Sequence, residues 1–234
     1  EDGHDVRVIL VTDFSHGGDV VLGNPEIKDL TELRGRKIGV EQNALGAYVL
    51  TRALQSVKMS IADVIVVPLE LNEQEQAFLE GQVDAVVTFE PVHSRLIAKG
   101  AVRLFDSTQI PGEIVDVLAV RGSIVDDQPE QLSVLLRGWF SALRHLQEQP
   151  ADASEHMAAR LQLKPPIVLA ALEGLKFPDL DENFAMLAGQ RPKLIDTAER
   201  LARLMLEQKL LKKELDVSQL FTARPLQKIK NMID

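Results

Sequence analysis

The chain of 234 residues contains no cysteine. This absence excludes disulfide bonds, thiolate catalysis and cysteine-based zinc sites, but it decides no compartment, because proteins of either redox compartment can lack cysteine. Aromatic residues are also scarce, with a single tryptophan, Trp139, and a single tyrosine, Tyr48. Beyond Tyr48, Phe14 and Phe89, the sequence therefore offers no obvious aromatic wall for a ring-shaped ligand.

The chain also lacks an excess of basic residues. It holds 26 basic and 35 acidic residues, for a net charge of −9, and it has no long basic run. This balance argues against nucleic acid as a partner. No apolar run reaches the length of a membrane span, and no signal segment opens the chain; a trimmed or mature chain would look the same, so no compartment follows. The histidines show no metal-ligand spacing, so we expect no metal site and no cofactor. They are His4, His16, His93, His145 and His156.

Apolar runs bounded by turn residues alternate with helical periodicity over the first half of the chain. This alternation predicts an α/β fold with a mostly parallel sheet. We expect strands at 6–14, 19–23, 37–40, 64–69, 83–89, 102–105 and 114–120, and helices at 44–58, 72–79 and from 91 onward. From residue 129 the pattern is almost entirely helical. The helices expected there span 129–147, 151–161, 165–175, 181–188 and 191–211, followed by short terminal turns at 217–221 and 224–229.

The stretch 37–46 predicts a buried strand, a tight polar turn and a helix. Asn43 is a good N-cap because its side chain can accept a hydrogen bond from an amide at the helix start. The amides of Ala44, Leu45 and Gly46 then lie at the positive end of the helix, which suits an anion or another polar ligand. The alternative is an ordinary strand-to-helix connection with no ligand.

Three further turns lie at strand ends, at 13–19, 88–91 and 111–116. They carry carboxylates, the hydroxyls of Ser15 and Thr88, an aromatic ring and a glycine pair, and in open α/β sheets ligands bind beyond the carboxyl ends of strands. This mixture suits a small polar molecule or zwitterion, with amides for its acidic group and carboxylates for its amine; the alternative is a set of solvated loops. The candidate binding residues in these turns are Asp13, Ser15, Gly18, Asp19, Phe89, Glu90 and Glu113.

A hydrolase interpretation of Ser15 and His16 is disfavoured. The chain has no Gly-x-Ser-x-Gly elbow, and adjacent side chains of an extended segment point to opposite faces. We therefore expect no catalytic residues.

Several motifs in order resemble one family. They are Asp-Leu-Thr-Glu-Leu-Arg-Gly-Arg-Lys-Ile-Gly-Val at 29–40, Gln-Ala-Phe-Leu-Glu-Gly-Gln-Val-Asp-Ala-Val-Val-Thr-Phe-Glu-Pro at 76–91, and Asp-x-Ser-x-Gly-Gly-Asp at 13–19. Together they resemble the substrate-binding proteins of ABC importers for nitrate, sulfonates, taurine and thiamine-precursor pyrimidines. The resemblance covers almost the whole chain.

The resemblance implies a type II periplasmic-binding-protein fold, in which two α/β lobes are joined by two crossing strands and hold a ligand in a cleft. Residues 1–33 and 120–234 would form lobe I, residues 34–119 would form lobe II, and the crossings would lie near 22–33 and 117–121. Family members have a further strand–helix–strand–helix stretch before the point where this sequence starts. We therefore expect lobe I to be N-terminally incomplete and to lack part of its sheet and pocket.

The function implied is that of a periplasmic or extracellular solute-binding protein, with lipid anchoring left open. It would act as a monomer, close around a small polar or anionic organic ligand and deliver it to an ABC permease, without acting as an enzyme. The turn 43–46 would bind the ligand's acidic group, and the other turns would set specificity. Two alternatives stay open: a ligand-sensing domain of a membrane signalling protein, and an enzyme related to a pyrimidine-precursor synthase, for which His16 is the candidate reactive residue.

Overall fold

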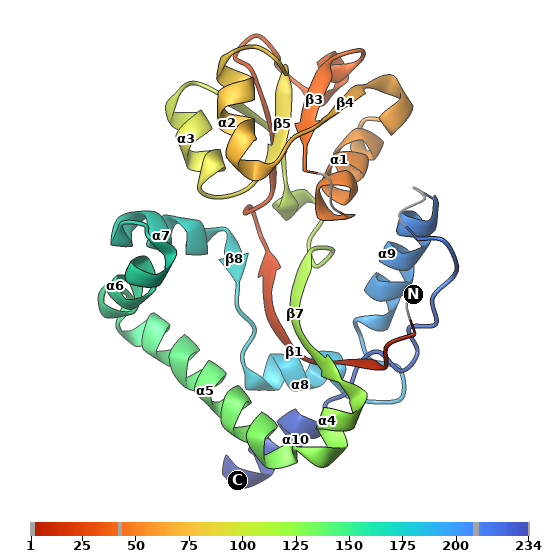
Figure 1. Cartoon of the computed structure of the whole chain (residues 1–234), viewed down its shortest axis with the longest axis vertical. Helices are drawn as coiled ribbons and strands as arrows, with labels where there is room; N and C mark the ends of the chain where they lie inside the picture. Colours follow the sequence, from red (N-terminus) through yellow and green to blue (C-terminus); the bar gives the residue numbers. More distant parts are fainter. Residues whose placement is uncertain (1–2, 42–43, 208–210, 234) are drawn as a thin grey trace. The chain divides into compact units, whose positions relative to one another are not determined.

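A computed structural model describes residues 3–41, 44–207 and 211–233 of the chain. By their contacts these residues divide into two units, each with its own sheet (Figure 1). Unit 1 comprises Glu1–Phe14, Val115–Leu169 and Lys176–Asp234, and unit 2 comprises Ser15–Ile114 and Ala170–Leu175.

Unit 2 is built on a five-stranded sheet in the order β4-β3-β5-β2-β6. Strand β3 is parallel to both β4 and β5, whereas β2 runs antiparallel to β5 and β6. Four of the five strands run in one direction, as a mostly parallel sheet requires, but both pairings of β2 are antiparallel, and the strand expected at 114–120 lies in the other sheet. The strands are β2 (Val20–Gly23), β3 (Lys37–Val40), β4 (Ile65–Pro68), β5 (Ala85–Thr88) and β6 (Val102–Asp106).

Helices cover the faces of this sheet because its strands are apolar on both sides. Every residue of β2 and β5 is buried. Val20, Leu22 and Val86 share one apolar cluster with residues of α2 and α3, and the intervening strand residues point to the opposite face, where α1 packs (Figure 1). The helices are α1 (Ala44–Ser56), α2 (Leu71–Leu79) and α3 (Val92–Ala98), with 3-10 turns at Leu30–Leu33, Ile61–Asp63 and Ser107–Gln109.

Unit 1 carries a three-stranded sheet in the order β7-β1-β8, and β1 and β7 are antiparallel. The late segment adds a parallel bridge to β1, because the amide of Val8 donates to the Leu220 carbonyl at 2.7 Å. The strands are β1 (Val6–Ser15), β7 (Val115–Arg121) and β8 (Leu175–Lys176).

Helices pack on the apolar side chains of β1 to form the core of unit 1, in which Ile9, Leu10 and Val11 are fully buried. Leu132 and Leu136 of α5 and Leu226 of α10 contribute from the helical side. The helices that contribute to this core are α4 (Gly122–Asp127), α5 (Pro129–Glu148), α8 (Leu180–Leu187) and α10 (Arg224–Ile233). The second half of the chain also contains α6 (Pro150–Leu161), α7 (Pro165–Glu173), whose last residues belong to unit 2, and α9 (Ile195–Glu207).

Three expectations need correction. The terminal turn expected at 224–229 is a ten-residue helix, α10, because Leu226 and Ile229 lie one turn apart and both are buried in the core. The helix expected at 191–211 begins only at Ile195. The helix expected at 72–79 begins one residue earlier, at Leu71, because Glu70 precedes it and forms a reciprocal capping box with Glu73.

The boundaries between the two units also differ from the lobe boundaries expected after residues 33 and 119. The physical reason is β2, which was placed in lobe I. It pairs with β5 on one side and β6 on the other, so residues 15–33 belong by contact to unit 2.

Candidate functional site in unit 2

Three strand ends meet at one edge of the five-stranded sheet. Because β2 is antiparallel, its first residue, Val20, pairs with Thr88 at the end of β5 and with Asp106 at the end of β6. The loop before β2 therefore lies beside the turns that leave β5 and β6. Helix α1, which follows the parallel strand β3, begins at this same edge. This is the carboxyl edge of the sheet, where open α/β proteins bind ligands.

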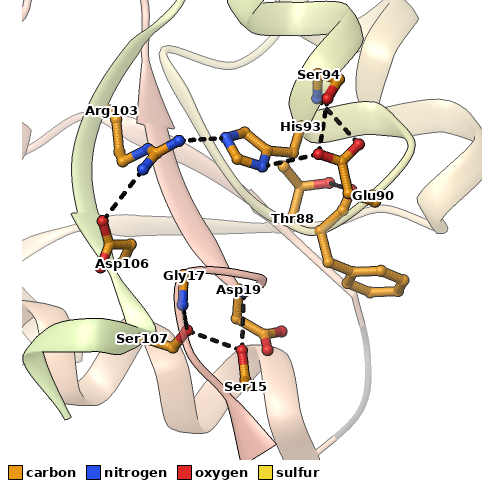
Figure 2. A network of polar contacts seen from close by, with 11 residues as sticks. Ser15, Gly17, Asp19, Thr88, Glu90, His93, Ser94, Arg103, Asp106 and Ser107 are labelled. Atoms are coloured by element: carbon orange, nitrogen blue, oxygen red, sulfur yellow. Dashed lines mark hydrogen bonds and ion pairs between the residues drawn. The ribbon is translucent and has the colours of Figure 1, made fainter. Parts of the chain in front are cut away.

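A pair of buried serines holds the loop before β2. The hydroxyls of Ser15 and Ser107 are 2.8 Å apart, and each accepts one backbone N–H: Gly17 donates to Ser107 at 2.6 Å and Asp19 donates to Ser15 at 3.1 Å (Figure 2). The amide of Ser107 in turn donates to the Asp19 carbonyl. These bonds fix the loop against the end of β6, so the main contribution of Ser15 is to shape the loop.

Glu90 is held by the first turn of α3. Its carboxylate accepts from Ser94 Oγ at 2.7 Å and from the Ser94 amide at 3.3 Å, and it lies 3.2 Å from Nδ1 of His93 (Figure 2). Burial raises the pKa of the Glu90 carboxyl, but the bonds from His93 and Ser94 together outweigh burial, and the pKa lies below its usual value. Glu90 is therefore an ionised acceptor at neutral pH.

Arg103 of β6 continues this arrangement on the other side of His93. Its Nη2 lies 3.0 Å from His93 Nε2, and its Nη1 is 3.4 Å from Asp106 Oδ2 (Figure 2). Asp106 also caps the 3-10 turn Ser107–Gln109 by accepting from the Thr108 amide. Burial raises the pKa of Asp106, but the bonds from Thr108 and the charge of Arg103 bring it below its usual value.

A cavity of about 480 Å³ lies among these groups, and all its lining residues belong to unit 2. Its volume is within the range of small-molecule sites. One wall comes from Gly17 and Gly18, which pack closely against Gly174, and the His16 amide donates to the Gly174 carbonyl at 2.8 Å. The charged and titratable side chains of the lining are His16, Glu90, His93, Arg103 and Glu173.

Glu113, a candidate ligand residue, is engaged by α1. Its carboxylate accepts from Nε and Nη2 of Arg52 at 2.6 and 2.9 Å and from the Tyr48 hydroxyl at 2.5 Å. The hydrogen bond to Glu113 is the main reason that the pKa of Arg52 lies above its usual value. The carboxylate ties the 111–114 turn to the helix, which accounts for a charged group whose side chain is only 10% exposed.

Arg52→Met is expected to lower the free energy of unfolding by about 1.5 to 3 kcal/mol, since the largely buried Glu113 carboxylate loses two charge-assisted donors. Urea unfolding followed by circular dichroism measures this effect. Arg36→Met is a matched control, because Arg36 contacts Asp84 through one bond at 3.1 Å on the surface. An equal loss in both variants would show that the Arg52–Glu113 pair contributes no more to the free energy of unfolding than the exposed Arg36–Asp84 pair.

The candidate residues other than Glu113 lie at three places in the structure. Ser15, Gly18, Asp19, Phe89 and Glu90 belong to the two turns beside the cavity, and Gly18 and Glu90 line it. Leu45 and Gly46 lie in the first turn of α1, which Ala44 begins as expected; Asn43 lies outside the described residues. Asp13 belongs to unit 1, buried within β1 opposite Asp116 of β7. Their roles in binding stay predictions.

Sequence reasoning missed His93, Arg103, Asp106 and Ser107. His93 was grouped with histidines that lack metal-ligand spacing, and no partner was sought for it. One signal was present: His93 follows Glu90 by three residues at a helix start, a spacing at which side chains meet. No comparable signal joins His93 to Arg103, because β6 and α3 come together only through the fold.

The family model described as the NMT1-like family matches residues 9–162. The chain belongs to the NMT1-like family. Over 92 residues, 39% of the chain, it is 28% identical to a putative aliphatic sulfonates-binding protein of Escherichia coli strain K12; the match spans 29% of that relative's length.

Two solved structures show the same fold. The periplasmic aliphatic sulphonate binding protein SsuA from Escherichia coli superposes with a TM-score of 0.78 at 18% identity, over 94% of this chain and 70% of that one. The desulfurization enzyme DSZB superposes with a TM-score of 0.73, also at 18% identity, over the whole of this chain and 81% of that one. The expected family and α/β periplasmic-binding-protein fold are thereby confirmed for the NMT1-like chain. Because a binding protein and an enzyme share this fold, the fold leaves the choice between them open.

Among the described residues of this family member, no helix is both long enough and apolar enough to span a bilayer.

Proposed function

We propose that this NMT1-like protein is an extracytoplasmic solute-binding protein that takes up a small polar or anionic organic molecule at the carboxyl edge of the unit 2 sheet. It would hand the molecule to the membrane permease of an ABC importer. The observation that carries the proposal is the cavity in unit 2, where the Gly17–Gly18 loop, the ionised Glu90 and the Arg103 guanidinium surround a space of ligand size. The sulfonate-binding relative supports the choice of ligand class.

The charges around the cavity indicate how a ligand would bind. Arg103 presents a guanidinium, which suits a sulfonate or carboxylate group. Glu90 presents an ionised carboxylate, which suits an amine or hydroxyl donor. A molecule that carries both an acidic group and a donor would therefore bind more tightly than a simple anion.

Titration calorimetry of the whole chain with taurine, methanesulfonate, nitrate and an aminopyrimidine tests the proposal. We expect binding of at least one compound, and Glu90→Gln is expected to weaken the binding of a donor-bearing compound at least tenfold, the worth of one charge-assisted hydrogen bond, about 1.4 kcal/mol or more. Glu75→Gln is the matched control, because Glu75 of α2 pairs with Arg95 and Lys99 and does not line this cavity. No binding by any of the compounds, or an equal loss in the two variants, contradicts the proposal.

A second candidate function is supported by one observation: His16 lines the cavity and is exposed, on a fold that the enzyme DSZB shares. The same titrations distinguish it. Chemical conversion of a bound compound that His16→Ala abolishes would favour an enzyme, whereas recovery of the compound unchanged favours a binding protein.

A further inference from the structure

His93 lies between one acceptor and one donor. It is 8% exposed, so water does not supply its partners freely. Its Nδ1 faces the Glu90 carboxylate at 3.2 Å, and its Nε2 faces Nη2 of Arg103 at 3.0 Å (Figure 2). These two contacts come from different elements, the turn after β5 and the strand β6.

The two contacts determine where the imidazole proton lies. An arginine side chain has only donors, so His93 Nε2 must be the acceptor in its contact with Arg103. The imidazole is then neutral and carries its proton on Nδ1, from which it donates to Glu90. A protonated ring would oppose its own N–H to that of Arg103 and could not keep this contact.

Arg103 is itself held in place from the far side. Asp106 lies 3.4 Å from its Nη1, and the other oxygen of Asp106 accepts from the Thr108 amide at the start of the 3-10 turn. Ser107, the first residue of that turn, accepts from the Gly17 amide and hydrogen-bonds to the Ser15 hydroxyl. The cavity's two walls, the loop before β2 and the first turn of α3, are thus connected through β6.

We propose that Arg103 and His93 are positioning residues for Glu90: Arg103 selects the Nδ1–H tautomer of His93, and that proton orients the Glu90 carboxylate as an acceptor facing the ligand cavity. The inference rests on the proposed function only in that the cavity is the binding site. Protonation of His93 removes the nitrogen acceptor that Arg103 contacts. The arrangement that orients Glu90 is then lost, so ligand affinity falls in acid. The charged or titratable groups that face His93 or share its cavity are Glu90 from its own turn, Arg103 and Asp106 from β6, and His16 and Glu173 from the opposite wall.

The first test needs no ligand. Long-range proton–nitrogen correlation spectra of the labelled chain at pH 7.5 are expected to show His93 as the Nδ1–H tautomer, with its signals assigned by their loss in His93→Gln. Arg103→Met is expected to remove that preference. Arg95→Met, at an exposed arginine of α3, the helix that carries His93, is expected to keep it. An Nε2–H tautomer in the wild type overturns the proposal.

The second test follows the Glu90 carboxyl carbon through an acid titration. Loss of the His93 donor in His93→Leu is expected to raise the midpoint for Glu90 toward its usual value, since hydrogen bonds to the ionised form lower a carboxyl pKa. His93→Gln, whose amide has both a donor and an acceptor but does not titrate, is expected to restore most of the shift. A midpoint unchanged in His93→Leu overturns the proposal.

The third test uses taurine as the probe between pH 5 and 8, the range in which imidazole changes charge. Affinity is expected to fall at least threefold toward pH 5 in the wild type and to stay level in His93→Gln. Level wild-type affinity overturns the acid-release part of the proposal. Absence of taurine binding at every pH counts against the proposed function, while the two ligand-free tests still decide the roles of Arg103 and His93.

Discussion

Asn183→Leu is expected to lower the free energy of unfolding by about 2 to 4 kcal/mol, the largest effect among the substitutions considered. Asn183 lies in α8 and is completely buried. Its Oδ1 accepts from the Val11 amide at 2.7 Å, and its Nδ2 donates to the Val11 carbonyl at 3.1 Å. The side chain thus satisfies both backbone groups of a residue in the middle of β1.

The position in β1 explains why this amide matters. The pairing of β1 with β7 is irregular between Val11 and Asp13, so the ladder is interrupted beside Val11. Asn183 Nδ2 also donates to the carbonyls of Pro178 and Asp179, which fixes the start of α8 on the strand. Leucine has a similar volume but no polar atoms, so it leaves a buried N–H and a buried C=O without partners, at about 1 to 3 kcal/mol each.

Urea unfolding measures this effect with a convenient reporter. Trp139 is the only tryptophan and lies in α5 of unit 1, the unit that contains Asn183. Asn231→Leu is the matched control: Asn231 is exposed on α10, where it accepts one bond from Gln227, and its loss is expected to cost less than about 0.5 kcal/mol. Equal midpoints for the two variants would mean that the Val11 groups find other partners.

Gly174→Ala is expected to cost about 2 to 3 kcal/mol and to weaken ligand binding in the unit 2 cavity. A Cβ atom at this position would lie 2.7 Å from the Cα and 2.9 Å from the N of Gly18. Both are backbone atoms, which cannot rotate away as a side chain can. The loop before β2 must therefore move away from the 170–175 segment to make room for the Cβ atom. That movement also strains the bond between the His16 amide and the Gly174 carbonyl.

Gly138→Ala is the matched control, and it is expected to stabilise the protein where Gly174→Ala destabilises it. Gly138 lies inside α5, and a Cβ there meets nothing within 4 Å. Alanine is the better helix former, so this variant is expected to gain about 0.5 to 1 kcal/mol. Thermal unfolding by circular dichroism compares the two glycines, and titration with taurine follows the cavity. Stabilisation by both substitutions would show that the close approach of Gly18 and Gly174 is easily relieved.

Local patterns in the sequence were sufficient for much of the fold. Apolar runs placed most of the strands, and the helix at Ala44 begins where the polar turn predicted it. Short-range reasoning failed where an element's neighbours decide its state. The apolar repeat formed by Leu226 and Ile229 is too short to predict α10 from the sequence. Their burial in the unit 1 core nevertheless stabilises a ten-residue helix.

The candidate site shows the same division. Glu90 and Gly18 were predicted from polar turns at strand ends, and the structure places both on the cavity. Glu113 was predicted by the same rule, but its carboxylate is bound by Arg52 and Tyr48, 61 and 65 residues earlier in the chain. A turn's composition shows which groups are available, whereas the packing of distant elements decides which of them stay available to a ligand.

The sequence by itself determined the α/β class, the absence of cysteine chemistry and the turns that carry polar groups, because each depends on residue type and on spacing within about one element. Only the tertiary structure decided that β2 inserts antiparallel between β5 and β6. That insertion brings the loop before β2, the turn after β5 and the end of β6 to one edge, and it joins Arg103, His93 and Glu90. Strand order depends on long-range pairing, for which the sequence of any one segment carries no signal.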